Sequence, residues 1–495
     1  MPASSEKKNR LPLTWNIPTE LIWTAIGAIF LLSFFLGVKK GIGTSLCLAF
    51  SLANTGIAAA CWFTSSYYIK RIPYGLVSAP VLLPLFWSFF AVIFPLAYLF
   101  GGVTYSPEFQ EYYVKAQLWV FLGTLMMCLG LSVFSKRFHT TPLPYLSARG
   151  FKNLRIAWWI LLGLSTLKWI QVYTMGLFGR AAAYIPEPTP FIWIYDQASF
   201  LSSYALLLIP VFIFSGKPTG SPNKRLWKWY QIATAVLLLL LFLKLQYRYL
   251  AVAGFLVFAG FCAHRPYKTR QYLLILIAVT LFAFPIINTL RSSEFIVGGK
   301  GKEQIEQMLS VKLKPALYAA YFTAEGIEQK NEWQRCGGTF EFTAATMSMI
   351  PEHRSYFLGR LLLQDLLLSI PYILYPGKYI HGPILQPETL INIRVRGLGT
   401  DTGMSPVIYL WAEGGPTAVL IGMFLFGLIY GWIYWKCILR MNSGLGILLY
   451  SFFPLSLMQL EEDWITNLIV PMRLCLVVVA IWWLVNMFSN RRKQS

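Results

Sequence analysis

The sequence has few charged residues, and acidic ones are the scarcest. Asp and Glu number 21 against 42 Lys and Arg, charged residues make up 13% of the chain, and His occurs four times. Hydrophobic residues make up 56%, which is more apolar side chain than a soluble core of this length could bury. The composition therefore excludes a soluble globular protein and predicts a polytopic membrane protein.

Several chemical signatures are also missing. The seven cysteines show no Cys-X-X-Cys or paired spacing, and most lie inside apolar runs, so we expect small hydrophobic residues and no disulfide framework. Gly-rich phosphate loops, Ser/His/Asp nucleophile signatures and nucleotide motifs are absent. The acidic cluster Glu461, Glu462 and Asp463 has no His nearby and no Asp-X-Asp pair occurs, which favours a solvated loop over a divalent metal site. We expect neither a metal nor a cofactor.

The net charge of +21 does not indicate nucleic acid as a partner. The basic residues are scattered through short segments between apolar runs, and this is the pattern that selects the topology of a membrane protein. We therefore expect no nucleic-acid binding.

Long apolar runs are what the sequence has in abundance. A helix needs about 20 apolar residues to cross about 30 Å of hydrocarbon. We predict an all-α fold with about twelve transmembrane helices, of which the eighth is short and the tenth is interrupted by Gly414, Gly415 and Pro416. The expected spans are residues 21–38, 42–63, 76–100, 118–134, 156–178, 192–214, 229–245, 250–263, 272–290, 405–435, 445–460 and 464–488.

These spans form one integral membrane domain with a long insertion. Residues 1–290 hold the first nine spans, residues 291–403 form a large loop, and residues 404–495 hold the last three. With both termini cytoplasmic, 22 of the 42 basic residues lie inside, as the positive-inside rule requires, although Lys39 and Lys40 violate it. The loop 291–403, which carries 11 of the 21 acidic residues, is then expected outside.

Residues 357–375 are the most structured-looking piece of that loop. The run is nearly long enough to span, yet it contains Arg360, Asp365 and Pro371. A thirteenth span would also place the segment with Lys436 and Arg440 outside. We therefore expect an interfacial or re-entrant helix that does not cross the membrane, and amphipathic helices within the loop.

Basic residues at membrane depth are the first functional candidates, because burying a charge in lipid is costly. Arg473 is expected near the midplane, Arg248 slightly below the outer face at the start of the short eighth span, and Arg291 at a comparable level after the ninth. Arginine binds phosphate through planar, bidentate hydrogen bonds, so such a cluster suits a diphosphate. The alternative for Arg248 and Arg291 is snorkelling to headgroups.

Two further residues could exchange a proton. His353 is one, although a loop histidine is more often only an exposed polar residue. Glu413, within the tenth span, would be costly against lipid, so it is either paired or lines a cavity.

The second half of the chain, from about Lys244 to the end, resembles a known family. The run Ser369-Ile-Pro-Tyr-Ile-Leu-Tyr-Pro-Gly-Lys378, followed by Met404-Ser-Pro406, Glu413-Gly-Gly-Pro416 and glycines spaced from Gly422 to Gly431, is similar to the outer loop and following helix of Wzy-type oligosaccharide repeat-unit polymerases. These include the O-antigen and common-antigen polymerases. Tyr372 departs from the pattern, since the family often has Arg there, and this leaves Arg394 and Arg396 as substitutes.

The resemblance implies a GT-C-like membrane fold and a metal-independent glycosyltransferase in the bacterial inner membrane. The enzyme would transfer a growing glycan from undecaprenyl diphosphate to the non-reducing end of a new lipid-linked repeat unit at the periplasmic face. A chain-length regulator protein is an implied partner. Arg248, Arg291 and Arg473 would bind the diphosphate, Lys378, Arg394 and Arg396 would contact substrate, and Glu413, Asp401 or His353 would accept the hydroxyl proton.

Two other functions stay open. An O-antigen ligase would use the same donor, but the His-rich outer-loop signature of ligases is absent here. A flippase or transporter for lipid-linked glycan would also need basic residues facing outward, but it would carry inverted repeats and would have little need for so long a loop.

Overall fold

The computed structural model describes residues 17–93, 95–96, 107–140, 148–174, 190–215, 224–243, 247–279, 343–344, 346–352, 355–369, 405–441, 443–453, 457 and 475–491. This part of the chain is helical and contains no β-strand. Its main helices are α1 (Thr19–Lys39), α2 (Thr44–Ile69), α3 (Ala79–Ser88), α5 (Pro107–Ser132), α6 (Ser135–Thr140), α7 (Ala148–Thr174), α8 (Pro190–Ser215), α9 (Lys224–Leu243), α10 (Tyr247–His264), α16 (Arg360–Ser369), α18 (Pro406–Tyr434), α19 (Gly444–Ser451) and α21 (Cys475–Arg491). Short 3-10 turns are η1 (Gly75–Val77) and η4 (Pro266–Lys268), and π-helical turns are η2 (Phe89–Ile93) and η8 (Trp435–Arg440).

The helices have the composition of a membrane-embedded bundle. Four of them are long and apolar enough to cross a bilayer: Thr19–Lys39, Thr44–Ile69, Gln110–Ser132 and Pro406–Arg440. Shorter apolar helices cover Ala79–Ile93, Ser202–Ser215, Leu250–His264, Thr269–Val279 and Val477–Phe488. Large apolar side chains also point outward, among them Phe35 at 65%, Leu239 at 60% and Trp483 at 61% exposure. Such a surface is stable against lipid, where every backbone group is satisfied within its own helix.

Most expected spans overlap described helices, but their ends differ. Each of the first eight apolar runs overlaps a described helix, and α5 already begins at Pro107, well before the expected start at Leu118. The eleventh run was expected to be helical to Leu460, whereas α19 ends at Ser451, three residues before Pro454. Proline has no N–H to continue a helical ladder, which gives this early end a physical reason. The total of twelve spans stays a prediction.

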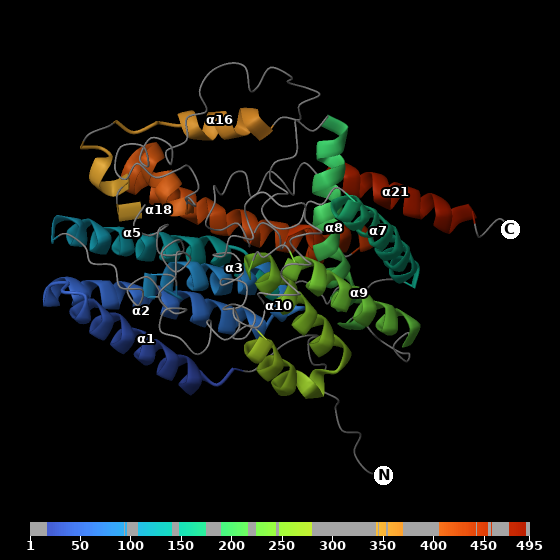
Figure 1. The fold of residues 1–495 in the computed structure, drawn as a ribbon, viewed down its shortest axis with the longest axis horizontal. Coiled ribbons are helices and arrows are strands. Elements are labelled where there is room, and N and C mark those ends of the chain that lie inside the picture. The colour runs from blue at the N-terminus through green and yellow to red at the C-terminus, as the bar shows by residue number, and fades with distance from the viewer. Residues whose placement is uncertain are drawn as a thin grey trace, which may run out of the picture.

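The bundle consists of two packed groups of helices (Figure 1). In one group α1 packs on α2, α2 on α3 and α5, and α5 on α18. In the other α7 and α10 pack on α8, α9 packs on α10, and α21 packs on α7. The turn η8 continues α18 and packs on α19, and α19 packs on α7 and α8, so the segment that follows α18 joins the two groups.

Helices α5 and α18 approach each other so closely that their backbones touch. A Cβ atom added at Gly130 would lie 2.1 Å from the carbonyl oxygen of Phe424, and one added at Gly427 would lie 2.0 Å from that of Met127. Glycine at both positions is what permits this distance, as in other membrane helix pairs with small residues at the contact. The pair fixes α18 firmly against the first group.

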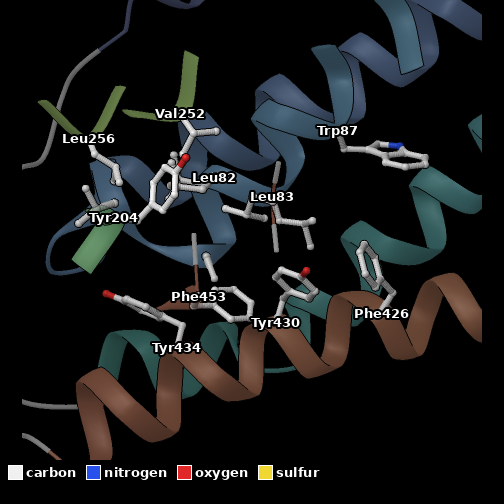
Figure 2. Close-up of a cluster of buried hydrophobic side chains, with 14 of the residues drawn as sticks. Leu82, Leu83, Trp87, Tyr204, Val252, Leu256, Phe426, Tyr430, Tyr434 and Phe453 are labelled. Atoms are coloured by element: carbon white, nitrogen blue, oxygen red, sulfur yellow. The ribbon is translucent and has the colours of Figure 1, made fainter. Parts of the chain in front are cut away.

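An aromatic core joins the two groups (Figure 2). It is built from α3, α8, α10 and α18, with Phe453 following α19, and its labelled members are Leu82, Leu83, Trp87, Tyr204, Val252, Leu256, Phe426, Tyr430, Tyr434 and Phe453. The Tyr434 hydroxyl donates a hydrogen bond to the carbonyl of Pro73, and that of Tyr450 donates to the carbonyl of Val77 at 2.8 Å. Two carbonyls of the segment between α2 and α3 therefore accept hydrogen bonds from residues far along the chain.

A buried polar chain links the first group internally. The Asn54 amide donates to the Ser33 hydroxyl at 3.1 Å, and the Gln117 amide donates both to Asn54 Oδ1 and, at 2.9 Å, to the Ala91 carbonyl. These residues lie on α1, α2, α5 and η2. Hydrogen bonds of this kind hold helices in one register where packing alone is permissive.

Candidate functional site

Helix α18 is broken one quarter of the way along, at the interruption that the sequence predicted. It starts at Pro406, with the Ser405 hydroxyl capping the Ile408 N–H at 3.3 Å. At Gly414 the backbone leaves the helical region, and Gly415 has φ +62° and ψ −144°, a conformation that only glycine adopts easily. Pro416 follows and has no N–H to offer the carbonyl of Ala412. The break therefore frees helical carbonyls for other partners.

The segment before α16 fills this break. The Phe357 N–H donates to the Ala412 carbonyl at 3.0 Å, and the Leu358 N–H donates to the Glu413 carbonyl at 2.8 Å. Leu358 has a φ of +50°, which turns the chain directly from the break into α16. We call this docked segment, residues 355–362, the α16 latch.

The Glu413 carboxylate completes the α16 latch. Its Oε2 accepts the Gly359 N–H at 2.5 Å and its Oε1 accepts the Leu362 N–H at 2.6 Å. Gly359 precedes α16 and Leu362 lies in its first turn, so the carboxylate caps the start of this helix and meets the positive end of its dipole. Glu413 is 7% exposed. Of the two alternatives that the sequence left open, the structure shows a paired carboxylate, and the pairing groups are backbone amides.

Residues 350–352, which precede the latch, lie beside α18 and the start of α5. The Trp411 Nε1–H donates to the Ile350 carbonyl at 3.0 Å, and its ring lies 5.5 Å from that of Trp119 on α5. The Tyr112 hydroxyl, also on α5, donates to the Glu352 carboxylate at 3.0 Å. The ammonium group of exposed Lys115 lies 5.9 Å from the Trp411 ring.

Helix α16 itself has ten residues, which corresponds to about 15 Å of helix, half of the hydrocarbon thickness. This length alone is too short to cross, and because residues 370–375 lie outside the described part of the chain, the helix that does not cross stays a prediction. In Figure 1 it lies beyond α18 at one edge of the bundle. Leu361 is 1% exposed, whereas an exposed apolar side is formed by Leu362, Leu363, Leu366 and Leu367.

Within the described part of the chain, the other site residues predicted from the sequence do not come together in one place. Arg248 lies in the first turn of α10, at the expected start of the eighth span, and its side chain is outside the description. Outside the described residues lie Arg291, His353, Lys378, Arg394, Arg396, Asp401 and Arg473. No three His, Cys, Asp or Glu side chains come together within the described part.

Two basic residues, one in the latch and one on α5, were not predicted from the sequence as site residues. Arg360 is the first residue of α16 and is exposed, and Lys115 is exposed near Trp411. Neither lies at predicted membrane depth, which was the criterion that selected Arg248, Arg291 and Arg473. The packing of α5 on α18 places Lys115 near Trp411, and the docking of the latch places Arg360 near Glu413.

The φ of Gly415 yields a direct prediction about the latch. In Gly415→Ala the new Cβ would lie 2.5 Å from the Tyr356 hydroxyl and the residue would keep a positive φ. We expect a loss of about 2 kcal/mol or more in stability, seen as a lower midpoint of thermal unfolding in detergent. Two ring carbons of Tyr356 would also lie 2.7 and 3.0 Å from the new Cβ, so adding Tyr356→Ala, which removes the ring, should recover part of the loss and leave the backbone strain.

Gly414→Ala serves as the control for that experiment. Gly414 has φ −162°, which is extended backbone, and its added Cβ would meet only the Ala418 Cβ at 3.1 Å. Its effect should be clearly smaller than that of Gly415→Ala. Equal midpoints for the two variants would contradict the conformation described at Gly415.

No family model, curated protein or solved structure matches the chain. The class of the protein therefore follows from its own helices: it is an all-α, membrane-embedded protein. Its distinguishing feature is an interrupted helix whose buried carboxylate holds the start of a short helix from the preceding segment.

Proposed function

We propose that the protein is a polysaccharide polymerase, a metal-independent glycosyltransferase that extends glycans carried on undecaprenyl diphosphate. The observation that supports this most directly is the α16 latch. Helix α16 ends at Ser369, the first residue of the run that resembles the Wzy-type polymerases, and Leu362, seven residues earlier, is bonded to Glu413. Seven helical residues span about 10 Å, so the latch keeps the start of that run close to the break in α18.

The proposed reaction needs no group beyond the substrates and the chain. The hydroxyl at the non-reducing end of a new lipid-linked repeat unit attacks the anomeric carbon of the donor glycan. The bond between that carbon and the diphosphate oxygen breaks, and undecaprenyl diphosphate leaves with the bonding electrons. Arg248, Arg291 and Arg473 would stabilise the charge that develops on the diphosphate, while Lys378, Arg394 and Arg396 would contact the substrates.

The hydroxyl proton needs an acceptor. Both carboxylate oxygens of Glu413 already accept backbone N–H groups, so we assign Glu413 to positioning the loop. His353 and Asp401 then stay as candidate bases. Lys115 and Arg360, exposed near the latch, are added as candidate contacts for the anionic substrate.

The test is polymerisation by the purified protein in liposomes supplied with lipid-linked repeat unit. We expect a ladder of longer lipid-linked glycans, and we expect Arg248→Ala and Arg473→Ala each to lower the rate about 100-fold, the usual cost of removing a group that stabilises developing charge. Arg265→Ala is the matched control, because Arg265 follows the opposite end of the helix that begins beside Arg248. It should behave like the parent.

Other outcomes identify other functions. Product that forms only when a lipid A core acceptor is added would show a ligase, and a change of sidedness without a change of product size would show a flippase. The polymerase proposal is wrong if the parent protein forms no lengthened glycan and both arginine variants behave like the parent in cells.

A further inference from the structure

A charged and aromatic cluster lies where α5, α18 and residues 350–352 meet. The Lys115 ammonium nitrogen lies 5.6 Å from the centroid of the Tyr112 ring and 5.9 Å from that of the Trp411 ring, within the range of cation–π attraction. The Tyr112 hydroxyl donates to the two oxygens of the Glu352 carboxylate, at 3.0 and 3.1 Å. One tyrosine thus neighbours both a cation and an anion. We call Tyr112, Lys115 and Glu352 the Lys115 site.

Both charged groups of the Lys115 site are available to a ligand. Lys115 and Glu352 are exposed, and within the described part of the chain neither of them makes an ion pair. The ring and the hydroxyl that they contact belong to one phenol, so the ammonium and the carboxylate lie within about 11 Å of each other. The ammonium has three N–H groups to donate, and the carboxylate has about four acceptor positions, of which the Tyr112 hydroxyl uses at most two.

An exposed apolar stripe on α5 continues from the Lys115 site. Four exposed leucines follow Lys115 at spacings of three or four residues, which keeps them on one side of the helix: Leu118, Leu122, Leu125 and Leu129. Lys115 lies three residues before the first of them and is on the same side. A ligand that combines a charged head with a hydrocarbon chain would therefore contact both the site and the stripe.

The charges around the site favour a zwitterionic head. Glu352 and Glu111, an exposed residue one turn before Lys115 on α5, supply two negative charges against one positive charge. A purely anionic head would attract the ammonium but would be repelled by the carboxylates. A head that carries a phosphate and a primary ammonium places each charge opposite its counterpart, and its N–H groups can donate to Glu352. A quaternary ammonium has no N–H group to donate.

We propose that the Lys115 site binds the head of a phospholipid with a primary ammonium, a phosphatidylethanolamine. The Lys115 ammonium donates to the phosphate oxygens, the lipid ammonium donates to Glu352, and an acyl chain follows the stripe from Leu118 to Leu129. With one hydrogen bond at each end, an extended phosphoethanolamine head spans about 12 Å, and a folded head spans less, so it can bridge the two groups. The proposal stands whether or not the protein is a polymerase, and it assigns Lys115 to a lipid instead of to the substrate.

Native mass spectrometry of the full-length protein in detergent, titrated with phosphatidylethanolamine, phosphatidylcholine or phosphatidylglycerol of the same acyl chains, tests the site. We expect the parent to bind phosphatidylethanolamine most tightly and Lys115→Gln to weaken this binding about tenfold. Glu352→Gln should remove most of the advantage over phosphatidylcholine. It should also raise the affinity for phosphatidylglycerol, because a repelling charge is lost.

The opposite effects expected for Glu352→Gln guard against misfolding, since a damaged site would lose every lipid. The matched control is Lys39→Gln with Glu20→Gln, an exposed lysine and an exposed carboxylate at opposite ends of the apolar helix α1. It should change the affinity for phosphatidylethanolamine less than about twofold, since distant charges act weakly in salt.

Three results would each overturn the proposal. They are equal weakening in the control, no preference of the parent for phosphatidylethanolamine over the other two lipids, and full displacement by an equal concentration of free phosphoethanolamine. Tighter binding of phosphatidylglycerol would return Lys115 to the anionic substrate, and displacement by phosphoethanolamine would indicate a soluble ligand.

Discussion

Glu413→Ala is expected to release α16 from the bundle while the other helices stay folded. The substitution removes the acceptors of the Gly359 and Leu362 N–H groups, and hydrogen bonds to a charged group contribute about 1.5 to 3 kcal/mol each. The opening free energy of the latch should fall by about 3 to 6 kcal/mol for the two bonds. Hydrogen exchange of the α16 amides should then speed up about 100- to 20,000-fold, whereas amides in α2 and α5 keep their rates.

Two further variants test whether α16 is held by its hydrogen bonds to Glu413 or only by negative charge in this region. Glu413→Gln keeps one acceptor oxygen but turns an NH2 group toward the second N–H, so it should release α16 nearly as well. Glu352→Ala removes an exposed carboxylate of the same segment, which accepts the Tyr112 hydroxyl, and should cost no more than about 1 kcal/mol. Unchanged exchange of α16 in Glu413→Ala would show that the carboxylate does not hold the helix.

Gly427→Val is expected to separate α5 from α18 and to prevent stable folding. Its Cβ would lie 2.0 Å from the Met127 carbonyl oxygen and 3.1 Å from the Leu131 nitrogen, both backbone atoms that cannot rotate away. Overpacking costs about 1 to 3 kcal/mol where side chains can adjust, and more is expected where two backbones must move apart. The measurement is the yield of monodisperse protein in detergent and its midpoint of thermal unfolding.

Gly163→Val provides the comparison. Gly163 lies on α7, and a Cβ added there would meet nothing within 4 Å. This variant should retain the parent's yield and midpoint. Gly130→Ala, whose Cβ would meet the Phe424 carbonyl oxygen at 2.1 Å, should share the defect of Gly427→Val. If Gly427→Val folds like Gly163→Val, the close approach of α5 and α18 is wrong.

The break in α18 could be predicted because its cause is local. Gly414, Gly415 and Pro416 interrupt any helix, whatever surrounds them. What fills the break could not be predicted, because Gly359 is 54 residues from Glu413 in sequence and the bonds between them involve backbone N–H groups that every residue carries. The sequence therefore predicted that Glu413 is either paired or lines a cavity, and it did not distinguish between these two alternatives.

The positions of the helices could likewise be predicted where the cause is local in the sequence, and not elsewhere. Apolar runs located α1, α2 and α18 because lipid selects for hydropathy alone. The start of α5 at Pro107 was missed since its first turns contain Glu108, Gln110 and Glu111, and their polarity hides a helix that continues beyond the apolar part. The π-turn η8, which ends at Arg440, has no sequence signal that we recognise.

The backbone contact between α5 and α18 also constrains how the protein is made. Gly130 and Gly427 are separated by about 300 residues. At about 5 to 20 residues per second, ribosomes take roughly 15 to 60 s to supply the second glycine after the first. During that interval the glycine side of α5 has no α18 to cover it, and lipid or insertion factors must occupy it instead. A nascent chain arrested before Gly427 should therefore remain vulnerable to membrane proteases, and resistance should appear once α18 has been inserted.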